Sequence, residues 1–237
     1  MIRFYSSEIA ESFTLPEEES KHCVKVLRHS EGDSIEIVDG KGHLYKCIIT
    51  DANPKKVTIR IEETIKEENP WKGSLVVAIA PTKNTERMEW LVEKLTEVGV
   101  DIIIPMKCEH SERKILKTDR LEKKIISAMK QSLKTVKPKL SEISEFRDII
   151  SNYERFPQKF ICYCDEILGK ESLACQIKAA EDTIILIGPE GDFSKEEVKE
   201  SIEKGYVPVS LGPCRLRTET AALVAADTFH IVNQQCN

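Results

Sequence analysis

The stretch IILIGPEGDFSKEE, residues 184–197, decides the fold. Its first four residues form a continuous apolar run, which is typical of a strand buried on both faces. A turn with two glycines follows, and Ser194 with Glu197 then forms a capping box that opens a helix ending before Gly205. A strand, a tight turn and a helix start together predict a ligand site at the carboxyl edge of a sheet, with a plain connection as the alternative.

A second stretch, VSLGPCRLRTETAA at residues 209–222, repeats this pattern. A strand ends in Gly212-Pro213, and an apolar helix over 221–231 follows with Thr218 as its expected N-cap. Arginine beside a helix N-terminus is typical of an anion site. The alternative interpretation is a surface ion pair between Arg217 and Glu219 with ordinary capping.

Strands and helices alternate from Trp71 onward. Apolar runs predict strands at 75–80, 102–104, 160–164, 183–187 and 206–211. Amphipathic spacing predicts helices at 85–98, capped by Gly99, and at 120–136, stopped before Pro138. This order indicates an α/β domain with a mainly parallel sheet over residues 71–237.

The pattern of residues 1–70 predicts a smaller β-rich domain, whose strands could form a compact barrel. A helix is expected at 17–27, and alternating residues predict strands at 34–38, 44–49 and 57–61. The turn over 39–42 joins two of these strands as a hairpin. The polar segment 66–70 ends in a turn signal and is the expected domain boundary.

Composition excludes several classes of protein. The 237 residues are 41% hydrophobic and 32% charged, which is typical of a soluble globular chain, and no apolar run is long enough to cross a membrane. The first residues lack the apolar core of a signal peptide, so a cytoplasmic location is expected. No metal site is expected, because the eight cysteines form no C-x-x-C pair; they are Cys23, Cys47, Cys108, Cys162, Cys164, Cys175, Cys214 and Cys236. Cys162 and Cys164 are expected on one strand face as small buried hydrophobes.

Charge is unevenly distributed along the chain. The net charge is −5, but residues 107–139 carry eleven basic and four acidic side chains. A local basic block can bind phosphates while the whole chain stays acidic. The alternative is an ordinary solvated helix face.

The two loops resemble motifs of the RsmE family, a SPOUT-class family of ribosomal RNA methyltransferases. The segments that carry the resemblance are GPEG at 188–191 followed by Phe193-Ser194, and LRTETA at 216–221. Residues 83–100, and Arg3-Phe4-Tyr5 with His22 and residues 26–28, resemble the family as well. The likeness covers nearly the whole chain. Asp192 replaces a usual glycine, and Lys130 replaces a usual glutamate.

This resemblance implies a SPOUT domain with a trefoil knot, preceded by a PUA-like RNA-binding β-barrel. It implies a homodimer that uses S-adenosylmethionine to methylate N3 of a uridine in 16S ribosomal RNA, in the assembled small (30S) subunit. Two alternatives stay open. One is a SPOUT enzyme that acts on tRNA, and the other is a non-catalytic RNA-binding module.

The expected site residues follow from these motifs. Arg217 is expected to stabilise the charge that develops on the base, and Glu219 to orient Arg217 or accept the N3 proton. The expected cofactor-binding residues are Cys162, Leu186, Gly188, Pro189, Glu190, Gly191, Leu211, Gly212, Leu216, Thr218, Thr220 and Ala221. The expected RNA-binding residues are Arg3, Lys21, Lys25, Arg28, Arg113, Arg120, Lys123, Lys124 and Lys134.

Overall fold

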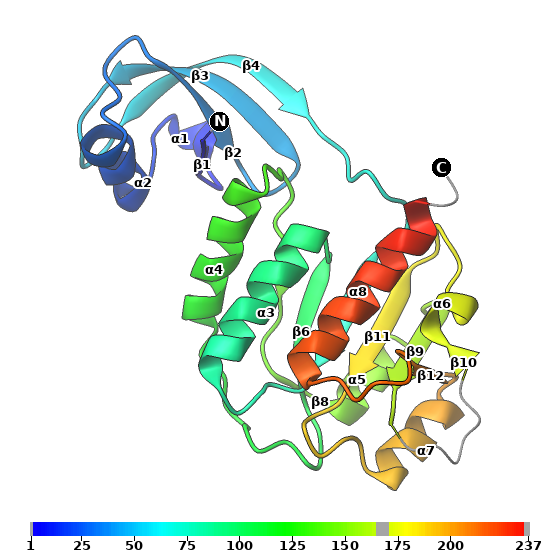
Figure 1. The fold of residues 1–237 in the computed structure, drawn as a ribbon. Coiled ribbons are helices and arrows are strands. Elements are labelled where there is room, and N and C mark those ends of the chain that lie inside the picture. The colour runs from blue at the N-terminus through cyan, green and yellow to red at the C-terminus, as the bar shows by residue number, and fades with distance from the viewer. Residues whose placement is uncertain (1, 165–170, 235–237) are drawn as a thin grey trace. The chain divides into compact units, whose positions relative to one another are not determined.

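The computed structural model describes residues 2–164 and 171–234 (Figure 1). The chain forms two compact units. The smaller comprises residues 1–69 and 126–137, and the larger comprises residues 70–125 and 138–237. Helix α4 (Thr118–Gln131) belongs by its first half to the larger unit and by its second half to the smaller.

The smaller unit contains a four-stranded sheet in the order β1-β2-β3-β4. These strands are β1 (Arg3–Tyr5), β2 (Ser34–Val38), β3 (His43–Asp51) and β4 (Thr58–Lys66). Strand β1 runs parallel to β2, and the other pairs are antiparallel. The predicted hairpin is confirmed, since Gly40 and Gly42 take φ angles of 75° and 99° in the turn between β2 and β3.

Short helices lie between β1 and β2. They are α1 (Ile9–Ser12), α2 (Glu17–Lys21) and the π-helical turn η1 (His22–Val26). The helix predicted at 17–27 is therefore confirmed, but its second half is wound as a π-helix. Buried Ile9 and Cys23 pack with the inward residues of the strands in one core.

The end of α4 corrects a prediction. The helix was expected to run to Val136, but it ends at Gln131, and Leu133 takes the left-handed φ of 55°. Residues 135–137 instead bind the β2–β3 turn. The Gly42 N–H donates to the Thr135 carbonyl at 3.0 Å, and the Lys137 N–H donates to the Gly40 carbonyl at 2.9 Å. These bonds satisfy backbone groups that a longer helix would have used internally.

The larger unit is built on one parallel sheet in the order β10-β12-β9-β11-β5-β6-β7, with β8 paired to β6. The central strands are β5 (Leu75–Ile79), β6 (Ile102–Lys107), β9 (Gln158–Cys162), β11 (Thr183–Ile187) and β12 (Val207–Ser210). The shorter ones are β7 (Lys139–Leu140), β8 (Ser144–Glu145) and β10 (Glu171–Ser172). The predicted α/β class with a mainly parallel sheet is confirmed.

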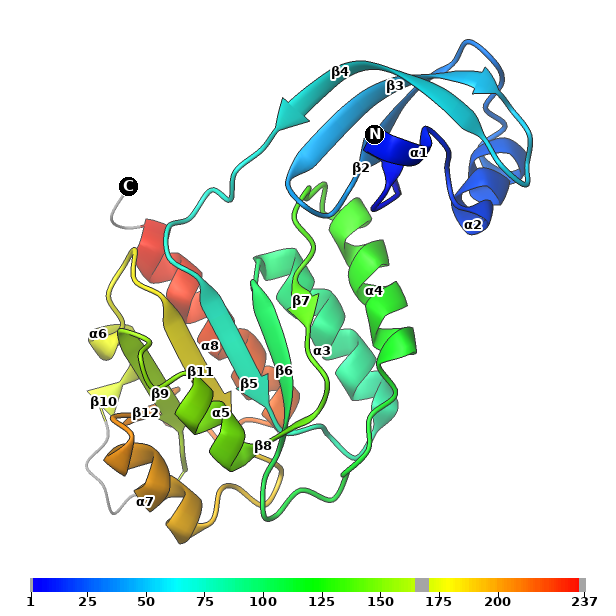
Figure 2. The same ribbon diagram turned by 180° about the vertical axis from the view of Figure 1, so that it is seen from behind.

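Helices cover both faces of this sheet (Figures 1 and 2). Helices α3 (Thr85–Val98) and α8 (Thr218–Gln234) pack on one face with the first half of α4, while α5 (Phe146–Asn152) and α7 (Lys195–Glu203) cover the other. Alternate strand residues therefore feed two separate cores. A short helix, α6 (Leu173–Gln176), adds Leu173 to the first of these cores. Helix α3 keeps its predicted bounds, with Gly99 at φ 109° as its left-handed cap.

Several features differ from expectation or were not predicted. The short elements β1, β7, β8, β10, α1, α5 and α6 were not predicted, because runs of two to seven residues carry little periodicity. Strand β9 ends at Cys162, so Cys164 lies beyond it and is exposed, contrary to the expected buried pair. Cys236 lies outside the described residues. The knot stays a prediction.

Candidate functional site

Three strand ends meet at the carboxyl edge of the sheet. Cys162, the last residue of β9, pairs with Ile187 of β11 on one side and with Val209 of β12 on the other. Because each strand lies about 4.8 Å from its neighbour, the chain segments that leave β11 and β12 start about 10 Å apart. The two motif loops therefore flank Cys162, and this register brings them to one site.

The first loop, residues 188–193, is packed against the protein. A Cβ atom on Gly188 would lie 3.0 Å from the ring of Phe193, which is tighter than most Cβ contacts and would require the ring to shift. Phe193 is buried in the core beneath α5 and α7. The capping box predicted at Ser194 and Glu197 is present, so the helix that follows begins where expected.

Asp192 ties this loop to two neighbours. Its φ of 63° lies in the left-handed region, which aspartate adopts more readily than most residues. One carboxylate oxygen accepts the Cys164 N–H, and the other accepts the N–H of Phe193, both at 2.9 Å. The Asp192 carbonyl also lies 3.0 Å from Nδ1 of His110. The carboxylate thus links the loop after β11 to the end of β9.

Glu190 fastens the same loop to the segment after β5. Its exposed side chain accepts the backbone N–H of Lys83 at 3.3 Å. The Ala80 N–H also donates to the Ile187 carbonyl at 3.0 Å. The chain after β5 is therefore part of the same edge of the sheet.

The second loop, residues 211–217, is open by contrast. Gly212 has a φ of 121°, and a Cβ atom there would meet nothing within 4 Å. Residues 212–215 and Arg217 are exposed. Within residues 2–164 and 171–234, the backbone N–H groups of 214–217 donate no hydrogen bond. These donors, together with half-buried Leu211 and Leu216, can meet a ligand that has both polar and apolar parts.

The expected pairing of Glu219 with Arg217 is not present. Glu219 is 8% exposed, and its Oε1 lies 3.6 Å from Nε of Arg87 on α3. The Arg217 side chain is exposed and forms no hydrogen bond or ion pair with any described residue. The neighbouring carboxylate is turned inward because α8 packs on α3, so the surface-pair interpretation is wrong as well.

The other expected cofactor residues differ in accessibility. Leu186 is fully buried in the sheet, so it can offer a ligand nothing from its side chain. Thr218 is buried and is the first residue of α8 rather than its N-cap, since the Arg217 carbonyl already accepts the Ala221 N–H at 2.8 Å. The residues that stay half-buried at this edge are Cys162, Leu211, Leu216, Thr220 and Ala221.

Several expected RNA-binding cations already have protein partners. Arg3 is largely buried in the smaller unit, where it pairs with Glu36 at 3.3 Å and with Glu67 at 3.7 Å. Two carboxylates therefore hold its guanidinium, and its expected role in RNA binding stays a prediction. Lys21 pairs with Glu17 at 2.6 Å, whereas Lys25 and Arg28 are exposed.

In the larger unit, Arg120 Nε lies 2.6 Å from the buried Glu89 carboxylate. Arg113 donates to the Lys83 carbonyl at 2.6 Å. Lys123 is exposed and Lys124 half-buried on α4. In the smaller unit, Lys134 is half-buried. Arg113 and Arg120 of the basic block are therefore already held by other protein groups.

Arg87 and Lys83 are site residues that the sequence reasoning did not assign. Both fall in the 83–100 segment that resembles the family, which was the available signal. Among the described residues, no three His, Cys, Asp or Glu side chains gather where they could hold a metal ion. No helix in the described part of the chain is long and apolar enough to cross a membrane.

Comparison with known families gives two adjoining matches. Residues 67–230 match the model of an RNA methyltransferase domain. Residues 15–62 match an RNA methyltransferase PUA domain. The second match lies wholly within the four-stranded unit, and the first covers the parallel sheet and its helices up to residue 230 of α8.

Relatives align over nearly their whole length. The ribosomal RNA small subunit methyltransferase E of Bacillus subtilis is 28% identical, covering 92% of this chain and 89% of that protein. A "probable rRNA-methyltransferase" from Porphyromonas gingivalis has a crystal structure with a TM-score of 0.95, 39% identity and full coverage of both chains. The ribosomal RNA small subunit methyltransferase E of Neisseria gonorrhoeae, bound to S-adenosyl methionine, has a TM-score of 0.85 and 26% identity, covering 98% of each chain.

Proposed function

We propose that this chain, which belongs to the RsmE family of RNA methyltransferases, methylates N3 of one uridine in 16S ribosomal RNA. Its substrate is the assembled small (30S) ribosomal subunit, its methyl donor is S-adenosylmethionine, and it works as a homodimer in the cytoplasm. The observation that carries the proposal is the register of β11, β9 and β12. It brings both motif loops to one sheet edge, with Cys162 between them.

The residues at this edge fit the cofactor. S-adenosylmethionine supplies a methyl group on a positively charged sulfur, together with a flat base and an amino acid part. The open space over Gly212 suits the polar atoms of this cofactor, as do the N–H groups of 214–217, which donate to no described residue. Leu211 and Leu216 suit its flat apolar surface. The packed loop at 188–192 forms the opposite wall, because Phe193 and Asp192 hold its shape.

Arg217 is the residue that we assign to the base. The N3 lone pair of neutral uracil is delocalised, so the N3 proton must leave as the methyl group arrives. Negative charge then develops on the imide, and an exposed guanidinium hydrogen-bonded to a uracil carbonyl oxygen stabilises it. The target nucleotide must be unpaired or flipped out to present this atom.

Glu219 takes a different role from the one expected of it. Because it is buried and paired with Arg87, it is poorly placed to accept a proton from an exposed base. We assign it as a positioning residue that fixes the start of α8, and with it the backbone from which Arg217 projects. The proton then leaves to water or to a group on the RNA.

The smaller domain, residues 1–70, supplies RNA affinity in this proposal. Lys25 and Arg28 are exposed there, and Arg28 stands on a left-handed turn with a φ of 62°. In the larger unit, exposed Lys123 and half-buried Lys124 are candidates for phosphate contacts. We expect all four residues to contact phosphates through their charge and not to recognise particular bases.

Methyl transfer to defined RNAs tests the proposal. Labelled S-adenosylmethionine is incubated with small subunits from a strain that lacks this protein, with total tRNA, and with free 16S RNA. The digested nucleosides are then separated by mass spectrometry. We expect 3-methyluridine from the small subunits alone. Label in tRNA would instead support the transfer RNA alternative, and S-adenosylhomocysteine that fails to bind in calorimetry would support a non-catalytic module.

A further inference from the structure

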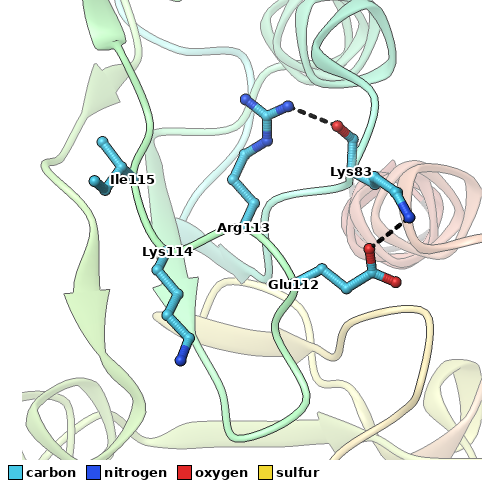
Figure 3. Close-up of a pocket in the computed structure, with 5 residues that line it drawn as sticks. All are labelled: Lys83, Glu112, Arg113, Lys114 and Ile115. Carbon is cyan, nitrogen blue, oxygen red and sulfur yellow. Dashed lines mark hydrogen bonds and ion pairs between the residues drawn. The ribbon is translucent and has the colours of Figure 1, made fainter.

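A hollow opens beside the first loop in the larger unit. Five residues line it, and its volume is about 500 Å³, within the range of small-molecule sites. Figure 3 shows them as Lys83 from the segment after β5, and Glu112, Arg113, Lys114 and Ile115 from the segment between β6 and α4. None of these residues belongs to either motif loop.

Two bonds fasten the segments that form the hollow to each other. The Arg113 guanidinium donates to the Lys83 carbonyl at 2.6 Å, and the Lys83 ammonium lies 2.9 Å from a Glu112 carboxylate oxygen (Figure 3). The hydrogen bond to Glu112 raises the pKa of Lys83, so its ammonium stays charged. A hydrogen bond and an ion pair therefore hold together the two segments that line the hollow.

The hollow also adjoins the candidate site. The backbone N–H of Lys83 donates to Glu190 of the first loop, and Ala80 bonds to the end of β11. A ligand in the hollow would therefore lie next to the wall that we assign to the methyl donor. The same chain segment serves both places.

The chemistry of the lining selects an anion. Three cationic side chains and one carboxylate line the hollow, and Lys83 already neutralises that carboxylate. The Arg113 guanidinium and the Lys114 ammonium point away from each other (Figure 3). Arg113 uses one of its five N–H groups on a carbonyl and keeps the others, while Lys114 is exposed and makes no ion pair with any described residue. Ile115 is 79% exposed, which places an apolar side chain beside these charges.

We propose that this hollow binds the RNA backbone next to the target uridine, with Arg113 and Lys114 each donating to a different phosphate and Ile115 under a neighbouring base. The inference rests on the proposed function and adds a substrate subsite to it. A phosphodiester carries one negative charge and is flanked by flat bases, so it matches both the spare cations and the apolar side chain. Holding those phosphates positions the flipped base toward Arg217.

Variants of Lys114 test the proposal, because Lys114 takes no part in the two bonds that join the lining segments. We expect K114E to raise the KM for small subunits about tenfold, which corresponds to one lost charge-assisted contact. Its affinity for S-adenosylhomocysteine should stay that of the unaltered protein. We expect K114Q to make the plot of log affinity against log salt shallower by about 0.7, the value for one phosphate on a single strand.

K178E and K178Q are the matched controls. Lys178 is equally exposed, but it bonds to Gln158 at the start of β9, at the opposite edge of the sheet. Both variants should keep the KM and the salt slope. If K114E and K114Q also keep them while the unaltered protein methylates the subunits, the subsite is overturned and the proposed function stands. If the unaltered protein neither binds nor methylates the subunits, the proposed function fails and the subsite fails with it.

Discussion

The two loops at the sheet edge have the same plan but opposite surroundings. Each follows a parallel strand, contains a glycine at its start and leads into a helix. The loop at 188–193 is bound to its neighbours through Asp192, Glu190 and the Phe193 ring. The loop at 211–217 has exposed residues, open space over Gly212, and backbone donors that are unused by the described residues.

This difference indicates a division of work. A wall whose shape is already fixed loses little conformational entropy when a ligand binds. An open loop with spare donors can instead adapt to the ligand and present a side chain to the substrate. We therefore expect changes in the first loop to act through stability and cofactor affinity, and changes to the exposed side chains of the second to act through catalysis.

Replacing Arg217 should have the largest effect. R217A removes the donor that stabilises the charge on the base, so we expect kcat to fall by about 10²–10³-fold. The affinity for S-adenosylhomocysteine should change less than about twofold, because only the side chain is removed. R215A is the matched control, since Arg215 is an exposed arginine of the same loop. Equal losses in both variants would contradict the assignment.

Substitutions of Gly188 and Gly212 should destabilise the protein for different reasons. G188A brings a methyl group within 3.0 Å of the Phe193 ring, so we expect a loss of about 1–3 kcal/mol in unfolding free energy from overpacking. G212A meets no neighbour, but its φ of 121° is strained for alanine, with a cost of similar size. The second change F193L should rescue G188A and leave G212A unimproved in urea denaturation. Rescue of both, or of neither, would argue against the packing difference.

Arg87 and Glu219 should be energetically coupled. R87A leaves a buried carboxylate without its cation, so we expect a loss of about 1–2 kcal/mol, reduced because Arg87 is itself 38% exposed. E219Q removes the charge that needs compensation. The double variant should therefore be more stable than the sum of the two single losses predicts. Additive losses in chemical denaturation would mean that the ion pair does not anchor α8.

Asp192 should have the smallest effect of these. D192G keeps the left-handed turn and removes the carboxylate that binds the N–H groups of Cys164 and Phe193. We expect S-adenosylhomocysteine to bind about three- to tenfold more weakly by calorimetry, because the loop is less well held. D192N tolerates the same turn and keeps one acceptor oxygen, so it should fall between. Unchanged binding in D192G would mean that Asp192 only fills a glycine position.

The sequence predicted those elements whose periodicity is long or whose caps are strong. Helix α3 matches its predicted bounds because Asn84 and Gly99 both cap it, and β11 matches because its apolar run is bounded by polar residues and a glycine. The predicted end of α4 was wrong. Nothing local reveals that residues 135–137 find backbone partners in a turn almost a hundred positions earlier.

For the site, too, local features could be predicted from the sequence and contacts between distant segments could not. The sequence could identify both loops, since strand–glycine–helix patterns are local. It could not show that Cys162 stands between them, because strand order is a property of the whole sheet. The pairing of Glu219 with Arg87 was missed for the same reason, as it depends on α8 packing against α3. The ion pairs of Arg3 with Glu36 and Glu67 could not be predicted either, because these residues are far apart in the sequence.

Hydrogen–deuterium exchange with and without S-adenosylhomocysteine tests most directly whether these two loops enclose one ligand. Peptides covering 186–193 and 210–221 should both exchange more slowly with the ligand. The larger change should fall on 210–221, where the backbone N–H groups of 214–217 donate to no described residue. Protection of only one of the two peptides, or of neither, would contradict the shared site.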